Sequence, residues 1–384
     1  MKKHKPKSSL LPIGISDLLE KNTYKDSYLT DNLMSCFKQN GYEKVIPPLI
    51  EFEDNYTLFL DTTNKQNIFR VIDPISNKPM FIRNDITPQI ARIAANKLNN
   101  INNINNILRL SYAGDILRPK GNQLHPSRQL KQAGIELFGA PTVEAAVEVI
   151  SVGIQALNQV NISNLIIDIT TPNLANLIMN NNKLDDQTIE KAKSYLKVKN
   201  INKIKTIPNC GSILSQIADS AGEEERALEK LSNIDLPNEA KKLINKISLI
   251  SDAIKKLHKN VKITIDPIEN RGFNYYSGIG FAIFSSNIKR ELGFGGEYVL
   301  EFNDIHYNGM GLSILFDGLL KATNIEDKQK RILIPLKHDA SIPPELRKNG
   351  WITILNYKNN VKDTEEALKY NCSHILKNNE IEEL

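Results

Sequence analysis

The sequence has little of what would mark a secreted, metal-binding or membrane-spanning protein. It holds three cysteines, Cys36, Cys210 and Cys372, and no two of them form a CxxC pair. This spacing argues against a disulfide framework and a zinc knuckle, and predicts buried free thiols in a reducing compartment. No apolar run approaches the roughly 18 residues of a membrane span, and residues 1–11 lack the apolar stretch of a signal peptide. We therefore expect a cytoplasmic protein without a bound metal.

Nucleotide-binding fingerprints are also missing, because neither GxGxxG after a strand nor GxxxxGK[ST] occurs. The glycines of residues 293–296 are not followed by a helix, so they indicate either a tight turn or close backbone approach, or a backbone that lines a ligand. The chain also lacks a large excess of one charge sign. It has 49 basic and 44 acidic residues, for a net charge of +5, and the lysines are spread along the chain. This balance permits a nucleic-acid partner without indicating one.

The length of 384 residues, of which 41% are hydrophobic, predicts about two domains with ample residues for a buried core. We predict a disordered basic tail over residues 1–10, a main body over residues 11–325 and a small α/β domain over residues 331–384. Within the main body, residues 172–259 read as a helical insertion rich in lysine and asparagine. Most other strands follow one another without crossover helices, which predicts an antiparallel sheet flanked by helices, an α+β fold.

Hydrophobic alternation predicts two strands over residues 108–117 and 128–138, joined by a polar loop. A short strand is predicted over residues 305–308, and a helix over residues 312–322.

Polar residues gather in the strand-like segments. Asp85 and Thr87 lie on the same side of an extended chain, and Gln132 and Glu136, four residues apart in a strand, project from one face. Arg118 ends the neighbouring strand. The remaining candidates follow later in the chain: Arg271, Tyr275 and Tyr276.

These residue types suit a free amino acid. Carboxylates pair with an α-ammonium group, arginine binds a carboxylate or phosphate by forked hydrogen bonds, and tyrosine offers a ring wall with a polar tip. Taken singly, each residue is also explained by a surface salt bridge or a solvated strand face. Charges among apolar strand neighbours fit that explanation less well, because burying them unpaired is costly.

At these residues the sequence resembles class II aminoacyl-tRNA synthetases of the histidyl type. The similar segments follow the family's order and span about residues 10–322. They are GYEKVIPPLIEF at 41–52 (first motif), RNDIT at 83–87 (Arg-Pro-Glu-Gly-Thr), 112–139 with RQLKQAGIELFG (second motif), RGFNYY at 271–276 and GGEY at 295–298 (histidine-specific segments), and 311–320 (place of the third motif).

The resemblance implies a class II synthetase-like fold and a site for histidine. Asp85, Thr87 and Gln132 would contact the α-amino group, although Asp85 is one methylene shorter than the glutamate of the family. Arg118 would face the carboxylate or an α-phosphate.

For the other end of the ligand, the resemblance implies that Glu136 and Tyr275 or Tyr276 line the imidazole side, and that Arg271 lies at the carboxyl end. It also implies a homodimer formed through the strand of the first motif.

Departures from the synthetase pattern bear on activity. Arg118-Pro119-Lys120 stands where the second motif has Arg-x-Glu, Gly318 stands where the third motif ends in arginine, and Glu297 replaces another arginine. Contacts to developing phosphoryl charge carry much of transition-state stabilisation. Without them we expect negligible adenylation, hence no aminoacylation and no tRNA partner.

The sequence of residues 83–89 resembles the synthetase-derived regulatory subunits of ATP phosphoribosyltransferase. The short C-terminal unit, which stands in place of an anticodon-binding domain, resembles them as well. This implies a cofactor-free, non-catalytic subunit that joins a short-form catalytic subunit in the first step of histidine biosynthesis, with histidine as a feedback ligand. Two alternatives stay open: a divergent histidyl-tRNA synthetase, and a synthetase-like protein with another amino-acid ligand or partner.

Overall fold

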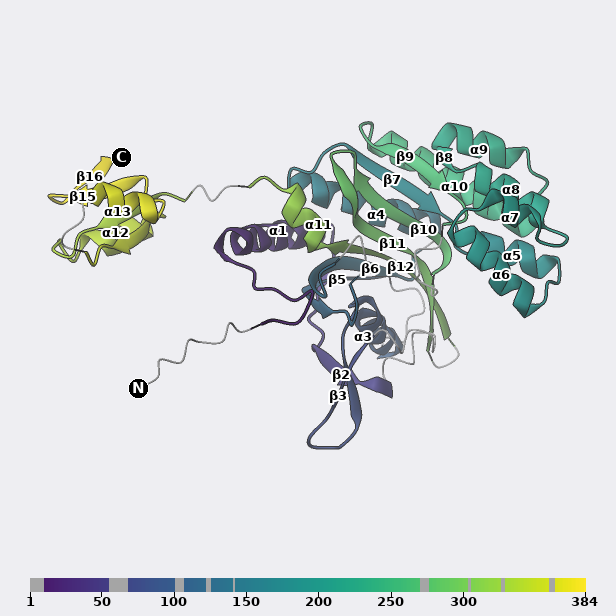
Figure 1. The fold of residues 1–384 in the computed structure, drawn as a ribbon, viewed down its shortest axis with the longest axis horizontal. Coiled ribbons are helices and arrows are strands. Elements are labelled where there is room, and N and C mark those ends of the chain that lie inside the picture. Colours follow the sequence, from purple (N-terminus) through teal and green to yellow (C-terminus); the bar gives the residue numbers. More distant parts are fainter. Residues whose placement is uncertain are drawn as a thin grey trace. The chain divides into compact units, whose positions relative to one another are not determined.

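The computed structural model describes residues 10–54, 68–100, 107–121, 126–140, 142–269, 276–302, 305–325, 329–358 and 363–384. The chain divides into two compact units, Met1–Thr323 and Asn324–Leu384 (Figure 1). The site candidates Arg271 and Tyr275 and most of the predicted tail lie outside the described residues.

The first unit is built on a sheet whose described part has nine strands. Their spatial order is β1 (Glu43–Lys44), β5 (Leu108–Leu117), β6 (Gln129–Phe138), β12 (Ile305–Leu315), β11 (Ile288–Phe302), β10 (Tyr276–Ser285), β7 (Leu165–Thr170), β9 (Lys262–Asp266) and β8 (Gly222–Glu223). All neighbours from β5 through β7 pair antiparallel. The predicted α+β class is thereby confirmed.

The two faces of this sheet carry different helices. Apolar side chains of β6 and β12, such as Ile135 and Leu312, share a core with α1 (Glu20–Gln39) and α4 (Thr142–Gln159). The fit is close: a Cβ added at Gly153 of α4 would lie 2.7 Å from Leu312 Cδ2. Tyr112 and other side chains of the opposite face pack against α3 (Thr87–Asn100).

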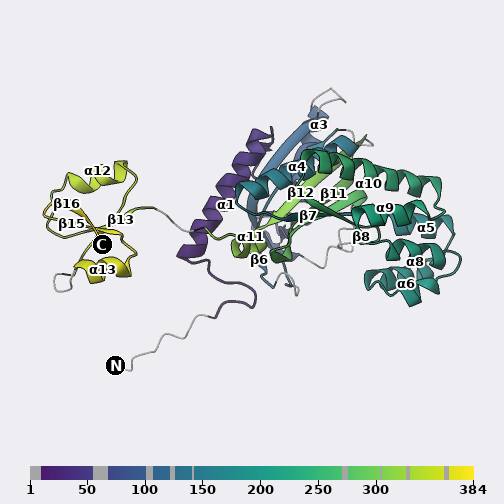
Figure 2. The ribbon, with the colours of Figure 1, turned by 90° about the horizontal axis from the view of Figure 1, so that it is seen from above.

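The helical insertion lies between β7 and β9. It consists of α5 (Leu174–Asn181), α6 (Asp186–Lys197), α7 (Ile201–Lys205), α8 (Gly211–Asp219), α9 (Glu224–Ser232) and α10 (Asn238–Leu257). The Asp185 side chain caps α6 by accepting a hydrogen bond from Thr188 N at 2.8 Å, and Asn200 caps α7 in the same way. Helix α10 runs beside α4 (Figure 2). Within the described residues, no helix combines the length and apolarity needed to cross a membrane.

A small sheet of β2 (Ile50–Phe52), β4 (Pro79–Ile82) and β3 (Phe69–Ile72) precedes α3. The buried Glu51 carboxylate accepts hydrogen bonds from Arg92 Nη2 at 2.5 Å and Gln89 Nε2 at 2.9 Å, which fixes β2 against α3. Arg83 is also buried and donates to the carbonyl oxygens of Asp115 and Pro47. These contacts hold residues 83–87 beside β5.

The second unit is a small α/β fold. Its elements are β13 (Arg331–Ile334), α12 (Ile342–Lys348), β14 (Ile352–Leu355), α13 (Asp363–Lys369), β15 (His374–Lys377) and β16 (Glu380–Glu383). The sheet order is β14-β13-β15-β16, with the first three strands parallel and β16 antiparallel to β15. Ile332, Ile334, Leu346 and Leu376 form one of its buried clusters.

One local prediction is wrong, and one pair of alternatives is decided by the structure. The helix predicted over residues 312–322 begins only at Phe316, where α11 (Phe316–Ala322) starts, because residues 312–315 complete strand β12. A short apolar run does not by itself distinguish a central strand from a buried helix. Of the alternatives for residues 293–296, the tight turn is wrong because they lie within β11, whereas close backbone approach is confirmed: a Cβ at Gly295 would come 2.1 Å from the Gly311 carbonyl oxygen.

Candidate functional site

Strand β6 presents Gln132 and Glu136 on the same face, toward α3, because residues an even number apart project alike. Glu136 is opposite Gly311 of β12, and a Cβ at Gly311 would lie 2.0 Å from Glu136 Oε2. The glycine therefore leaves the space in which the carboxyl group lies.

Gln132 joins β6 to the segment before α3. Its Nε2 donates to Asp85 Oδ1 and to Ser313 Oγ, each at 2.8 Å, while its Oε1 accepts from Ile86 N at 3.0 Å. Asp85 Oδ1 also accepts from Thr87 N at 3.1 Å. The structure thus brings together four of the predicted residues. Gln132, Asp85 and Thr87 are joined by the hydrogen bonds above, and Thr87 and Glu136 both contact the Tyr112 hydroxyl.

Tyr112, fully buried on β5, is the centre of this network. Its hydroxyl lies 3.0 Å from Ser313 Oγ and 3.2 Å from Thr87 Oγ1, and it donates to Glu136 Oε1 at 3.5 Å. On the other side of the carboxyl group, Tyr298 of β11 donates to Glu136 Oε2 at 2.7 Å.

Sequence reasoning missed Tyr112, Tyr298 and Ser313 as site residues. One signal was present: Tyr112 is opposite Gly134 in the β5–β6 pair, and a Cβ at Gly134 would lie 2.4 Å from the Tyr112 hydroxyl. A tyrosine opposite a glycine on paired strands indicates a ring that lies across the neighbouring strand. This signal can be used only when the pairing register of the two strands is known.

The electrostatics of the site are acidic. Burial raises the pKa of Glu136 to about 8, and nearby Asp85 adds to the rise, while hydrogen bonds from Tyr298, Thr87 and Tyr112 oppose it. Among the described residues, no lysine or arginine forms an ion pair with Asp85 or Glu136. Two neighbouring carboxyl groups without a cation form a site suited to a ligand with N–H or ammonium donors.

The remaining candidates are only partly placed. Arg118 is half-buried just beyond the end of β5, and its backbone N–H donates to the Arg128 carbonyl oxygen at 2.7 Å. No described residue accepts a hydrogen bond from its guanidinium group. Tyr276 begins β10 opposite Tyr298, although its side chain lies outside the description, as do Arg271 and Tyr275.

Glu297 does not belong to this cluster of hydrogen-bonded residues. Consecutive strand residues project to opposite faces, so Glu297 lies on the side away from Glu136. There it accepts from Lys246 Nζ of α10 at 2.6 Å and from Ile279 N at 3.3 Å. Glu297, which stands where the resemblance has an arginine, is therefore paired with a lysine on the face opposite Glu136.

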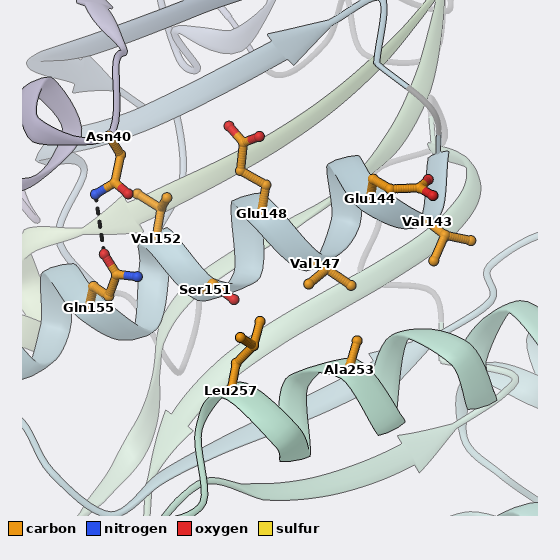
Figure 3. A pocket seen from close by; sticks show the side chains of 10 residues that line it. All are labelled: Asn40, Val143, Glu144, Val147, Glu148, Ser151, Val152, Gln155, Ala253 and Leu257. Atoms are coloured by element: carbon orange, nitrogen blue, oxygen red, sulfur yellow. Dashed lines mark hydrogen bonds between the residues drawn. The ribbon is translucent and has the colours of Figure 1, made fainter.

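A separate groove of about 510 Å³ lies on the α4 side of the sheet (Figure 3). It is lined by Asn40, Val143, Glu144, Val147, Glu148, Ser151, Val152, Gln155, Ala253 and Leu257. None of the sequence-predicted site residues lines it, and α4 and the sheet separate it from Glu136. In the described part of the chain, no cluster of histidine, cysteine and acidic residues is arranged to hold a metal ion.

The family model for histidyl-tRNA synthetase matches residues 14–319. The ATP phosphoribosyltransferase regulatory subunit of Paramagnetospirillum magneticum is 32% identical over 369 residues, which is 96% of each chain. That of Rhodospirillum centenum is 33% identical over 384 residues, 99% of this chain and 97% of the relative.

Solved structures show the same fold at lower identity. An ATP phosphoribosyltransferase regulatory subunit/histidyl-tRNA synthetase from Bacillus halodurans superposes with a TM-score of 0.79 at 21% identity, covering 97% of this chain and 98% of that one. A histidyl-tRNA synthetase from Nostoc gives a TM-score of 0.77 at 16% identity, covering 96% and 91%. With the family model and the near-complete relatives, the chain belongs to the histidyl-tRNA synthetase family and, within it, to the ATP phosphoribosyltransferase regulatory subunits.

Proposed function

We propose that this chain is a non-catalytic subunit that joins a short-form catalytic ATP phosphoribosyltransferase subunit in the first step of histidine biosynthesis. The observation that carries the proposal is the extent of the similarity to curated regulatory subunits. It covers 96% or more of this chain and of the relatives, so it includes the C-terminal unit as well as the synthetase-like core.

Two positions support the absence of adenylation. Lys120 is exposed and cationic where the second motif of synthetases has a glutamate. Gly318 is buried in α11 where the third motif has an arginine. A Cβ at Gly318 would lie 3.2 Å from the Glu291 carbonyl oxygen and 3.5 Å from Leu292 Cδ2, so a side chain there would press against the backbone of β11.

Free histidine is the proposed ligand of the Glu136 site, the network that includes Asp85, Thr87, Gln132, Glu136 and Tyr298. The Glu136 carboxyl group would accept the imidazole N–H, and Asp85 would hold the α-ammonium group with Thr87 and Gln132 keeping it in place. The guanidinium group of Arg118 would meet the ligand carboxylate. The absence of a cation beside either carboxyl group in the described residues supports this assignment, because a cationic ligand would supply the missing charge.

The first-motif segment supports a homodimer. Ile46 and Leu49 are 77% and 50% exposed, and Ile50 and Phe52 of β2 are about 40% exposed. They follow β1, which is the edge strand of the sheet in the part of the chain that the structure describes. Contiguous apolar exposure beside an unpaired edge is typical of an interface. We propose a cytoplasmic assembly around this dimer, in keeping with the three buried free thiols.

The test mixes the full chain with the short catalytic subunit of the same genome and follows phosphoribosyl-ATP formation with and without histidine. We expect activity to rise with this chain and to fall again with histidine. No complex in light scattering and no change in activity, with both proteins folded, would refute the proposal. ATP–pyrophosphate exchange in the presence of histidine would instead establish a synthetase.

A further inference from the structure

Two lysines of the helical insertion contact carboxylates of the central sheet. Lys246 of α10 donates to Glu297 Oε2 of β11 at 2.6 Å, and both side chains are mostly buried, at 16% and 12% exposure. A buried pair of this kind loses most of its stabilisation when one partner is removed, because the remaining charge stays desolvated.

The Glu297 carboxylate lies directly against the beginning of β10. A Cβ added at Gly278 would come 2.0 Å from Glu297 Oε2, and the backbone N–H of Ile279 donates to the same oxygen at 3.3 Å. Asn173, at the start of α5, donates to the Ser277 carbonyl oxygen at 3.0 Å. The first residues of β10 are therefore held from the side of the insertion.

Lys199, between α6 and α7, makes a more exposed contact with the end of β9, its side chain being 42% exposed and that of Asp266 12%. Its ammonium group pairs with Asp266 Oδ2 and lies 3.3 Å from Glu269 Oε2. Burial alone would lower the pKa of Lys199, but the Asp266 and Glu269 carboxylates outweigh it and raise that pKa. Thr170 Oγ1 also donates to the Glu269 carbonyl oxygen at 2.6 Å.

The two contacts share one arrangement. Each cation comes from the insertion, Asp266 and Glu297 come from the sheet, and the ends of β9 and β10 are separated in sequence by residues 267–275. Strand β10 begins opposite Tyr298, whose hydroxyl group donates to Glu136. Glu297 and Tyr298 are consecutive in β11 and project to opposite faces. This part of β11 therefore contacts α10 on one face and Glu136 on the other.

We infer that Lys199 and Lys246 are positioning residues, which fasten the end of β9 and the start of β10 to the helical insertion and thereby help to hold Tyr298 and the Glu136 site in place. The anchoring stands on the contacts above. Its consequence for histidine binding rests on the proposed function.

The first test is amide hydrogen exchange in the ligand-free chain. Lys199→Met should speed exchange in residues 262–269, and Lys246→Met in residues 276–285. The matched control is Lys230→Met, which removes an exposed pair with Asp219 within the same insertion and should leave both segments unchanged. If either lysine variant fails to fold, the double variant Lys246→Met with Glu297→Gln removes both charges of one pair. It should then show the faster exchange in residues 276–285. Unchanged exchange at both segments overturns the inference.

The second test titrates histidine by calorimetry. Lys246→Met should weaken binding by about tenfold, the range of coupling through positioning contacts, while Lys246→Arg should retain most of the affinity and Lys230→Met all of it. Faster exchange with unchanged histidine affinity overturns the positioning role. If the wild-type chain binds no histidine, the proposed ligand is wrong, and the exchange experiment alone decides whether the lysines anchor the strands.

Discussion

Buried and half-buried carboxylates occur in two kinds of surroundings in the described part of this chain. Glu51 accepts hydrogen bonds from Arg92 Nε and Nη2, and Glu148 is held by the fork of Arg109 at 2.7 and 2.8 Å. The Arg109 contact, opposed by partial burial, lowers the pKa of Glu148, whereas burial raises the pKa of Glu136 to about 8. The paired carboxylates join elements of the fold, whereas Asp85 and Glu136, which have no ion-pair partner among the described residues, form the site proposed to bind a ligand with N–H or ammonium donors.

Removing the arginine from a paired site should have the largest effect on stability. Arg92→Ala leaves Glu51, only 6% exposed, without its cation, and should cost about 3 kcal/mol in the free energy of unfolding by urea. Arg70→Ala, which breaks a more exposed pair with Glu53, is the control and should change that energy far less. Equal losses in the two variants would contradict the distinction.

Removing the carboxyl group from the unpaired site should instead affect binding. Glu136→Ala should weaken histidine binding about 30-fold in a calorimetric titration, because the variant cannot accept a hydrogen bond from the charged ligand. Glu144→Ala, on the exposed surface of the α4 groove, serves as the control and should bind normally. A titration unchanged by Glu136→Ala would place histidine elsewhere or show that it does not bind.

The pH dependence of stability should also separate the two kinds of site. The pKa of Glu136 rises from 4.5 to about 8 on folding, so the native state binds more protons than the unfolded state between these values. Glu136 should therefore reduce stability progressively as pH rises from about 4.5 to 8. Glu136→Gln should melt above the wild type at pH 8 and close to it at pH 4; a constant difference across that range would count against the burial of an uncompensated carboxyl group.

The smallest effect should come from one hydrogen bond within the site. Tyr298→Phe removes the donor 2.7 Å from Glu136 Oε2 and should cost about 1 kcal/mol of stability. Because that hydrogen bond lowers the pKa of Glu136, removing it should raise this pKa further. A melting temperature equal to that of the wild type would show that the tyrosine ring, rather than its hydroxyl group, matters there.

Local pattern explains which parts of the site could be predicted. Gln132 and Glu136 are four residues apart in one strand, so their common face follows from alternation alone. Tyr298 comes from β11, and its contact with Glu136 joins residues 162 positions apart in sequence. Ser313 was hidden for a related reason, because residues 312–315 read as the start of a helix and only their pairing with β6 makes them a strand.

The sequence by itself determined the family, the α+β class and the common face of Gln132 and Glu136, because ordered motifs and alternation are properties of neighbouring residues. Only the tertiary structure decided which carboxylates have a cation. Glu297 and Tyr298 are adjacent in sequence, yet one pairs with Lys246 of the insertion and the other binds Glu136. The sign of a carboxyl pKa shift depends on burial and on charges a few ångströms away, and those are set by the packing of distant segments.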